Sequence, residues 1–119
     1  MHTVIETPAY LASARDVGLD DDERDAIVTY LGRHPEAGDL ISGTGGARKL
    51  RFAGRSKGKS GGYRVITFFA DDDIPVFLLD IYGKGARANL SPAQRNELRK
   101  MLTALPQAWR AQSKSRRTK

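Results

Sequence analysis

The sequence predicts a small α+β domain, in which helices pack on one face of an antiparallel sheet. Along the 119 residues the pattern is one strand, two helices, three strands and one helix. This length suits a single domain with a modest core. Short connections join the three consecutive strands, and this favours an antiparallel meander covered by the helices.

The first third of the chain predicts one short strand and two capped helices. Thr7 is a capping residue followed by proline at the first helical position, and Gly18 ends that helix. Asp20 with Glu23 three residues later predicts a capping box, and Pro35 stops the second helix. The expected elements are a strand at residues 4–5 and helices over about 8–15 and 20–33.

Three strand-like runs follow a glycine-rich connector. The first alternates, with Leu50 and Phe52 on one face and Lys49 and Arg51 on the other. The second is rich in aromatic and β-branched residues. The third is apolar on both faces, which predicts a central strand that is covered on both sides. The expected strands span residues 48–53, 63–70 and 76–82, with an acidic turn at 71–73.

The chain closes with a helix and a basic tail. Ser91 and Gln94 form a second capping-box pattern, and Pro106 is expected to end the helix. A buried stripe is predicted from Leu98, Met101, Leu102 and Leu105. We expect one domain over residues 1–109 and a disordered tail over residues 110–119, which hold five cations.

Composition excludes several classes of protein. The chain has no cysteine, so disulfide frameworks, thiolate nucleophiles and cysteine zinc sites are excluded. It shows neither the pattern of a signal peptide at its start nor an apolar run long enough to span a bilayer, so a cytoplasmic protein without membrane contact is expected. No cofactor is expected. The two histidines, at positions 2 and 34, show no metal-ligand spacing, and the acids of the 71–73 turn are typical of solvated turn residues.

Charge is strongly segregated along the chain. Residues 1–39 hold nine acidic and three basic side chains, whereas residues 40–119 hold five acidic and seventeen basic ones. Seven cations and no acid lie between Arg48 and Arg64, around a glycine-rich loop. That loop resembles a phosphate-binding P-loop, but its glycine spacing is one residue short and it leads into a strand instead of a helix. A surface for nucleic acid is the favoured interpretation.

A cationic site of this kind could cut RNA without a metal. The 2′-hydroxyl is a nucleophile next to the phosphate, and preformed cations can stabilise the charge that develops on the phosphoryl oxygens. Arginine is a poor base, whereas a lysine among other cations can have its pKa lowered enough to accept a proton. The candidate bases are Lys49, Lys57, Lys59 and Lys84.

Spacing places some of these side chains. Lys49 and Arg51 should project from one strand face. Arg64, at the start of the next strand, should lie on the same face of that strand as Ile66, two residues later. Tyr82 is open to two interpretations, because it could stack on a base or pack at the edge of the sheet.

Three ordered motifs carry a resemblance that covers residues 4 to about 105. They read GDLISGTGGARKLRF, KGKSGGYRV and LLDIYGK, beginning at Gly38, Lys57 and Leu78. With these motifs the chain resembles the RelE/ParE superfamily of toxins from type II toxin–antitoxin systems, in particular the HigB-type host-inhibition toxins. The resemblance implies a RelE-like microbial ribonuclease fold. It also implies a metal-independent endoribonuclease that cuts mRNA in the ribosomal A site, and a cognate helix-turn-helix antitoxin.

The same resemblance assigns roles to residues. It places Lys49 and Arg51 among the phosphate-binding or proton-transfer cations, and Arg64 at the scissile phosphate. Lys84 falls in a cationic turn after the last strand. The catalytic candidates are therefore Lys49, Arg51, Arg64 and Lys84. The RNA-binding candidates are Arg48, Lys57, Lys59, Tyr82 and Arg87.

Two departures and one alternative accompany this assignment. The best-studied branch has an arginine where Gly85 stands and a tyrosine near Ser91, and here Arg87 and Tyr82 are the candidate substitutes. The superfamily also contains toxins that act on gyrase without ribonuclease activity, so fold alone does not decide activity. The alternative is a non-catalytic RNA- or ribosome-binding module, or a gyrase-targeting toxin.

Overall fold

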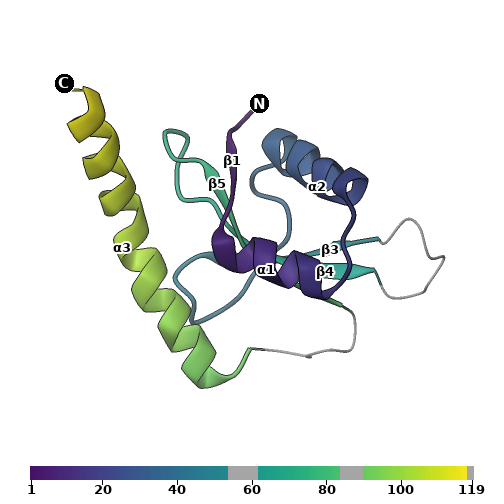
Figure 1. The fold of residues 1–119 in the computed structure, drawn as a ribbon. Coiled ribbons are helices and arrows are strands. Elements are labelled where there is room, and N and C mark those ends of the chain that lie inside the picture. Colours follow the sequence, from purple (N-terminus) through teal and green to yellow (C-terminus); the bar gives the residue numbers. More distant parts are fainter. Residues whose placement is uncertain (54–61, 84–89, 118–119) are drawn as a thin grey trace.

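The computed structural model describes residues 1–53, 62–83 and 90–117, with side chains as far as residue 112, and it confirms a small α+β domain (Figure 1). Five strands and three helices lie in these ranges. They are β1 (Val4–Glu6), α1 (Pro8–Asp16), α2 (Asp21–Arg33), β2 (Asp39–Leu40), β3 (Ala47–Phe52), β4 (Tyr63–Phe68), β5 (Val76–Gly83) and α3 (Pro92–Arg117).

The strands form one mixed sheet in the order β1-β5-β4-β3-β2. The predicted antiparallel meander is present in β3, β4 and β5. The prediction of a wholly antiparallel sheet is wrong, because β1 pairs with β5 in parallel, with Val4 opposite Val76. Parallel neighbours need a long crossover between them, and here the whole chain from α1 to β4 provides it.

One strand was missed by sequence analysis. The connector after α2 contains the two-residue strand β2, in which Asp39 lies opposite Lys49 of β3. A strand this short has no alternating pattern that a sequence could reveal.

Helices cover both faces of the sheet, not one face as predicted. Val65 packs with the α1 and α2 side chains Tyr10 and Ile27 in one buried cluster. Its neighbour Ile66 packs with Leu102 of α3 in a second cluster. Successive residues of a strand point to opposite faces, so the two clusters lie on opposite sides of the sheet. The prediction that β5 is a central strand covered on both sides is confirmed, since β5 contributes to both clusters.

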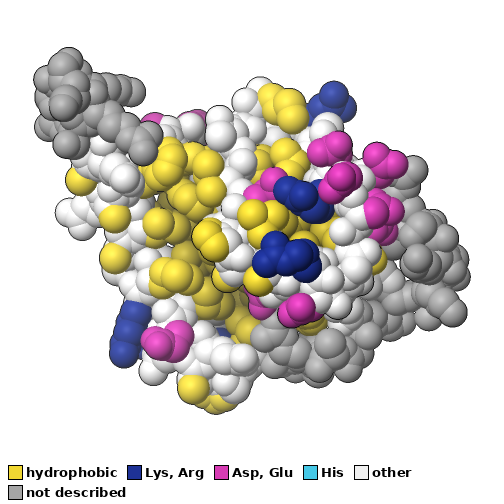
Figure 2. Space-filling view, in the orientation of Figure 1, with side chains coloured by type: hydrophobic (Ala, Val, Ile, Leu, Met, Phe, Trp, Pro, Cys, Tyr) yellow, Lys and Arg dark blue, Asp and Glu magenta, His cyan; other side chains and the backbone are white. Residues whose placement is uncertain are grey.

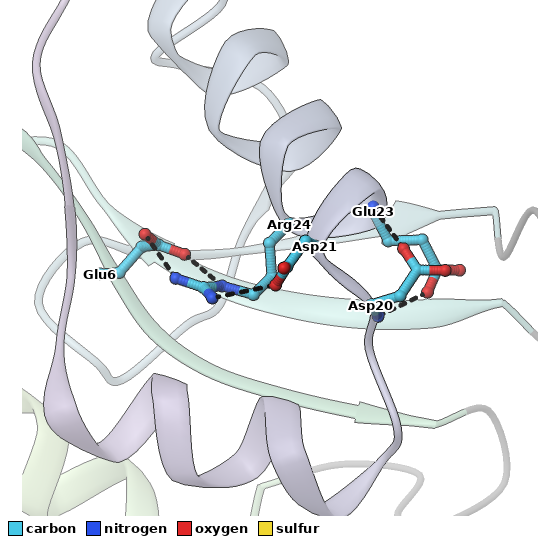
Figure 3. Close-up of polar contacts among 5 residues, drawn as sticks. All are labelled: Glu6, Asp20, Asp21, Glu23 and Arg24. Carbon is cyan, nitrogen blue, oxygen red and sulfur yellow. Dashed lines mark hydrogen bonds and ion pairs between the residues drawn. The ribbon is translucent and has the colours of Figure 1, made fainter.

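The predicted helix starts are confirmed in detail. The Thr7 hydroxyl accepts a hydrogen bond from the backbone N–H of Tyr10, and Pro8 is the first residue of α1. At the start of α2, Asp20 and Glu23 exchange side-chain and backbone hydrogen bonds of 2.8 and 3.1 Å (Figure 3). Both the Thr7 cap and the Asp20–Glu23 capping box satisfy backbone N–H donors that have no hydrogen-bond partner within the first helical turn.

A two-pronged ion pair connects α2 to the edge of the sheet. The Arg24 guanidinium donates from Nε and Nη2 to the two carboxylate oxygens of Glu6 in β1, at 3.0 and 3.2 Å (Figure 3). This fork geometry is stronger than a single contact. It raises the pKa of Arg24 further above its ordinary value, mainly through the hydrogen bond to Glu6.

The last helix is longer than predicted. The expected capping box at Ser91 and Gln94 is present, with hydrogen bonds of 2.8 and 3.1 Å. However, α3 continues through Pro106 to Arg117, so the predicted end at Pro106 is wrong. Contacts beyond the proline hold the helix: Trp109 packs edge-on against Phe77, with ring centroids 5.7 Å apart.

The residues assigned to a disordered tail are helical as far as Arg117. Arg110, the first of them, binds the acidic turn before β5, with its guanidinium 3.0 Å from Asp73 and 3.1 Å from Asp71. These pairs supply an anchor that composition alone does not reveal. Within the described residues, no helix combines the length and the apolar character needed to cross a membrane.

Candidate nucleic-acid interface

The register of β3 and β4 brings three of the predicted cations together. Arg51 lies directly opposite Arg64, and Lys49 lies opposite Ile66. Directly opposed residues, and residues two apart along a strand, point to the same face of a sheet. Lys49, Arg51 and Arg64 therefore share one face, which we call the cationic face.

The cationic face continues the surface that α3 covers. Ile66, Ala47 and Phe68 lie on this side of the sheet and are buried with Leu102 of α3. Arg51 and Arg64 stand beyond Ile66, toward the opposite end of β3 and β4. Arg51 is exposed, whereas Lys49 and Arg64 are half-buried. The helix therefore covers one end of this sheet face, and the arginines occupy the other.

None of these three cations forms an ion pair in the described ranges, although Asp39 of β2 lies directly opposite Lys49 and Asp80 of β5 lies on the same face. The ion pairs of that part of the chain involve His2, Arg24 and Arg110, each far along the sequence from the cationic face. A half-buried arginine that lacks a carboxylate partner keeps its five N–H donors available for a ligand, and it contributes its full charge to the local potential.

Arg48 does not join the cationic face. It lies opposite Thr67 on the other side of the sheet. Its guanidinium donates a hydrogen bond of 3.0 Å to the backbone carbonyl of Gly38 in the connector before β2. This contact holds the connector against β3, so Arg48 has a structural partner and points away from the other candidates.

Tyr82 occupies the cationic face but offers little surface there. It lies opposite Arg64 in β5. Its side chain is only 6% exposed and belongs to the cluster with Ile66 and Leu102. Of the two interpretations of Tyr82, packing is the one that fits its burial, because a stacking ring must present a face to the base.

Asp80 lies on the cationic face and was not among the residues predicted for it. It lies opposite Ile66 on the same side as Lys49, and a bulge between Ile66 and Thr67 places Leu79 beside it. The sequence feature that could have identified Asp80 is a single acidic residue inside an apolar strand, because acids are rarely buried in central strands. One Asp80 oxygen accepts a hydrogen bond of 2.9 Å from the backbone N–H of Ile81.

Four predicted residues lie outside the described residues: Lys57, Lys59, Lys84 and Arg87. The strand ends that flank them are described. One end of β3, β4 and β5 is formed by three neighbouring residues in register, Phe52, Tyr63 and Gly83. Arg51 and Arg64 are the next residues along β3 and β4.

Next to Ile66 the sheet forms a groove with α3 and the start of α1. Its volume is about 480 Å³, and its lining is mainly apolar, with Leu79, Leu98, Met101, Asp80 and Glu97 among the lining residues. Figure 2 shows hydrophobic side chains gathered in this part of the surface, between α3 and the rest of the domain. Apolar walls suit an apolar ligand better than a phosphate, so the groove is separate in chemistry from the cationic face.

The remaining titratable groups of the described residues can be placed one by one. In residues 1–53, 62–83 and 90–117, no three His, Asp or Glu side chains come close enough to hold a metal ion. His34 caps the end of α2 and contacts the Tyr30 ring, with centroids 4.7 Å apart and ring planes tilted by 40°. Burial, with the nearby Glu23 and Asp20 carboxylates, raises the pKa of Tyr63 above its ordinary value.

No protein-family model matches the chain.

Proposed function

We propose that the protein is the toxin of a type II toxin–antitoxin system, similar to the RelE/HigB-type toxins, and that it cleaves RNA. The observation that carries this proposal is the grouping of Lys49, Arg51 and Arg64 on one face of the sheet, without carboxylate partners in the described residues. The RNA phosphate is the ligand that such a face would bind most strongly.

In the proposed reaction Arg51 and Arg64 bind the scissile phosphate from two adjacent strands. The 2′-oxygen attacks phosphorus, the bond to the 5′-oxygen breaks, and a cyclic 2′,3′-phosphate remains on the upstream fragment. Two guanidinium groups stabilise the negative charge that builds on the phosphoryl oxygens, which is the largest contribution expected in such a site. Arginine suits this role because its planar fork matches phosphate oxygens.

Proton transfer is assigned to Lys49. As the 2′-hydroxyl attacks, its proton passes to the amine of Lys49, and the departing 5′-oxygen takes a proton from a solvent water. The Lys49 ammonium then returns its proton to the solvent. Lys49 is the lysine on the described part of the cationic face, two residues from Arg51. Lys84 is a second candidate for proton transfer. Three further residues are proposed to contact RNA: Lys57, Lys59 and Arg87.

The biological setting proposed here follows from the same resemblance. Cleavage takes place on mRNA in the ribosomal A site in the cytoplasm, so translation stops. A cognate antitoxin, a helix-turn-helix protein, neutralises the toxin. Co-expression with the protein encoded beside it should restore growth, and a stable complex should be recovered by size-exclusion chromatography.

The deciding experiment adds the full chain to a translating extract and maps new 5′ ends on a reporter mRNA by primer extension. Cleavage is expected with ribosomes and not on naked mRNA. Arg64→Gln should lose cleavage, because one phosphate-binding guanidinium is removed. Arg33→Gln is the matched control, since Arg33 is exposed at the end of α2, which packs on the opposite face.

Each other outcome overturns part of the proposal. Stopped synthesis with intact mRNA would replace the nuclease with a non-catalytic ribosome-binding protein. Uninterrupted synthesis with damaged DNA in cells would point to a gyrase-targeting toxin. Full cleavage by Arg64→Gln would remove this arginine from the site.

A further inference from the structure

Two arginines of α3 lie against the glycine-rich loop that precedes β3. Arg95 and Arg99 are four residues apart, so they project from the same side of the helix. A Cβ atom added at Gly43 would come within 3.7 Å of the Arg95 side chain, and one added at Gly45 would come within 3.4 Å of Arg99. The loop and the two side chains are therefore in close contact.

The loop is held in a defined shape. Thr44 is fully buried, its hydroxyl donates to the Ile41 carbonyl at 2.6 Å, and its oxygen accepts from the Ala47 N–H at 3.1 Å. Gly43 and Gly45 on either side of it have φ of 80° and 79°, a region that favours glycine. Both glycines are exposed, so the anchored loop presents bare backbone to solvent next to the arginines.

The donors of these arginines are largely uncommitted. Arg95 contacts Ser42 through one terminal nitrogen at 3.5 Å, the outer limit for a hydrogen bond, and its Nε is buried without a partner in the described residues. Arg99 donates a hydrogen bond of 2.5 Å to the side-chain amide oxygen of Asn96, a neutral residue of the same helix. Neither forms an ion pair within the ranges that the structure describes, so both charges are available to an anion.

This cluster lies on the same side of the sheet as the cationic face. An added Cβ at Gly46 would contact the Phe68 ring, and Phe68 is buried with Ala47 under α3. Ala47 begins β3, and Lys49 follows two residues later on the same face. A strand with about 3.3 Å per residue places the two positions about 7 Å apart. The basic side chains therefore lie on one side of the sheet, from Arg51 and Arg64 past Lys49 toward Arg95 and Arg99, with Asp39 beside Lys49.

We infer that Arg95, Arg99 and the loop Ser42–Gly46 form a second phosphate-binding site, which holds the backbone of a single RNA strand at a distance from the scissile phosphate. This inference rests on the proposed function, because the same strand occupies both places. The second site binds without reading bases, since guanidinium and backbone N–H groups contact phosphate oxygens. The second site therefore makes the protein bind a long RNA strand, which reaches both sites, more tightly than a short one that occupies only the cationic face.

The test measures binding of 2′-O-methyl RNA, which cannot be cleaved because its 2′-oxygen is blocked. Fluorescence anisotropy compares oligomers of about four and about sixteen nucleotides, which span the range of single-strand site sizes. The double variant Arg95→Gln/Arg99→Gln should lose about tenfold in affinity for the long oligomer and should bind the short one as the parent does. Its salt slope, log K against log salt concentration, should fall by about 1.4, or 0.7 per lost phosphate contact.

The matched control is Arg15→Gln/Arg33→Gln, which removes the same charge from exposed positions of α1 and α2 on the opposite side. It should change the affinity for the long oligomer by less than about twofold, since those charges contact no phosphate. Far-UV circular dichroism of both double variants verifies that α3 is intact. If the control loses as much affinity as the Arg95/Arg99 variant, general attraction explains the binding and the second site is wrong.

A further variant separates this inference from the proposed function. Arg64→Gln should weaken binding of both the short and the long oligomer. If Arg64→Gln weakens both while the Arg95/Arg99 variant weakens neither, the second site is wrong and the cationic face stands. If Arg64→Gln weakens binding of neither oligomer, Arg64 is not a phosphate contact and its role in the proposed function is wrong, whatever the Arg95/Arg99 variant does.

Discussion

Arg51 in β3 lies directly opposite Arg64 in β4, on the same face of the sheet. Like charges in this position destabilise a strand pair, on a scale of about 0.2–1 kcal/mol for cross-strand neighbours. No carboxylate of the described residues forms an ion pair with either arginine, so the repulsion is not offset there. Local conflicts of this kind are expected at functional sites, where positive potential is needed for a ligand.

Removing one arginine of this pair should stabilise the protein while it weakens RNA binding. We expect Arg51→Gln to raise the free energy of unfolding by about 0.2–1 kcal/mol, because the repulsion disappears. The melting temperature should rise by about 1–5 °C in thermal unfolding followed by circular dichroism. Arg33→Gln should not raise the melting temperature, because Arg33 lies in the last turn of α2, where a cation stabilises the helix. A lower melting temperature for Arg51→Gln would show that Arg51 stabilises the sheet through a contact that outweighs the repulsion.

Local sequence signals predicted the helix starts and the strand that carries the site. The caps at Thr7 and at Asp20 with Glu23 depend on residues within three positions of each other, so a sequence shows them directly. Alternation placed Lys49 and Arg51 on one face of β3, and the register agrees. These features need no knowledge of distant parts of the chain.

The features that sequence missed depend on distant contacts. The parallel pairing of β1 with β5 and the placement of α3 on the second face are decided by packing between residues far apart in the chain. Alternation with Lys49 places Arg48 on the other face, but its partner there, the Gly38 carbonyl, belongs to the connector before β2 and is not revealed by a local pattern. Asp80 joins the face of Lys49 through the pairing of both residues with Ile66, and this cross-strand register is not visible in the sequence.

Tyr10 should tolerate loss of its hydroxyl. The ring is fully buried, and the hydroxyl has no hydrogen-bond partner among the residues that the structure describes. A buried polar group without a partner costs free energy, so Tyr10→Phe should leave stability at pH 7 unchanged or raise it by about 1 kcal/mol. Urea unfolding measures this difference. A loss of more than about 1 kcal/mol would mean that the hydroxyl has a bound partner, such as an ordered water.

The same substitution should change the response to alkaline pH. Burial, followed by the nearby Glu6 carboxylate, raises the pKa of Tyr10 to about 12. The folded state therefore favours the neutral phenol, and this contribution is complete below about pH 10 and is lost as pH rises toward 12. At pH 11 the parent should have lost on the order of 1 kcal/mol relative to Tyr10→Phe. Parallel pH profiles of the two proteins would contradict this assignment.

Arg110 should make the protein sensitive to acid through Asp73. The hydrogen bond from Arg110 lowers the pKa of the Asp73 carboxyl below its ordinary value. A lowered pKa contributes stability above the unfolded value, and this is lost as pH falls through the folded one. Arg110→Gln should therefore lower the urea midpoint slightly at pH 7 and show a smaller further decline toward pH 3 than the parent. The effect is small because both side chains are exposed. Equal declines would show that the pair contributes nothing.

Pro106 should be a site where one substitution stabilises the protein. It lies inside α3, where it cannot donate a hydrogen bond to the carbonyl of Leu102 four residues earlier. Proline in a helix interior costs up to about 3 kcal/mol relative to alanine, so Pro106→Ala should raise the unfolding free energy by about 1–3 kcal/mol. Urea unfolding measures the gain, and Gln107→Ala, at an exposed neighbouring position, should change stability by less than about 0.5 kcal/mol. If α3 instead ended at Pro106 in solution, the proline would restrict only the unfolded chain, and replacing it would lower stability. The sign of the change therefore decides whether Trp109 and Arg110 are held on the sheet by a continuous helix.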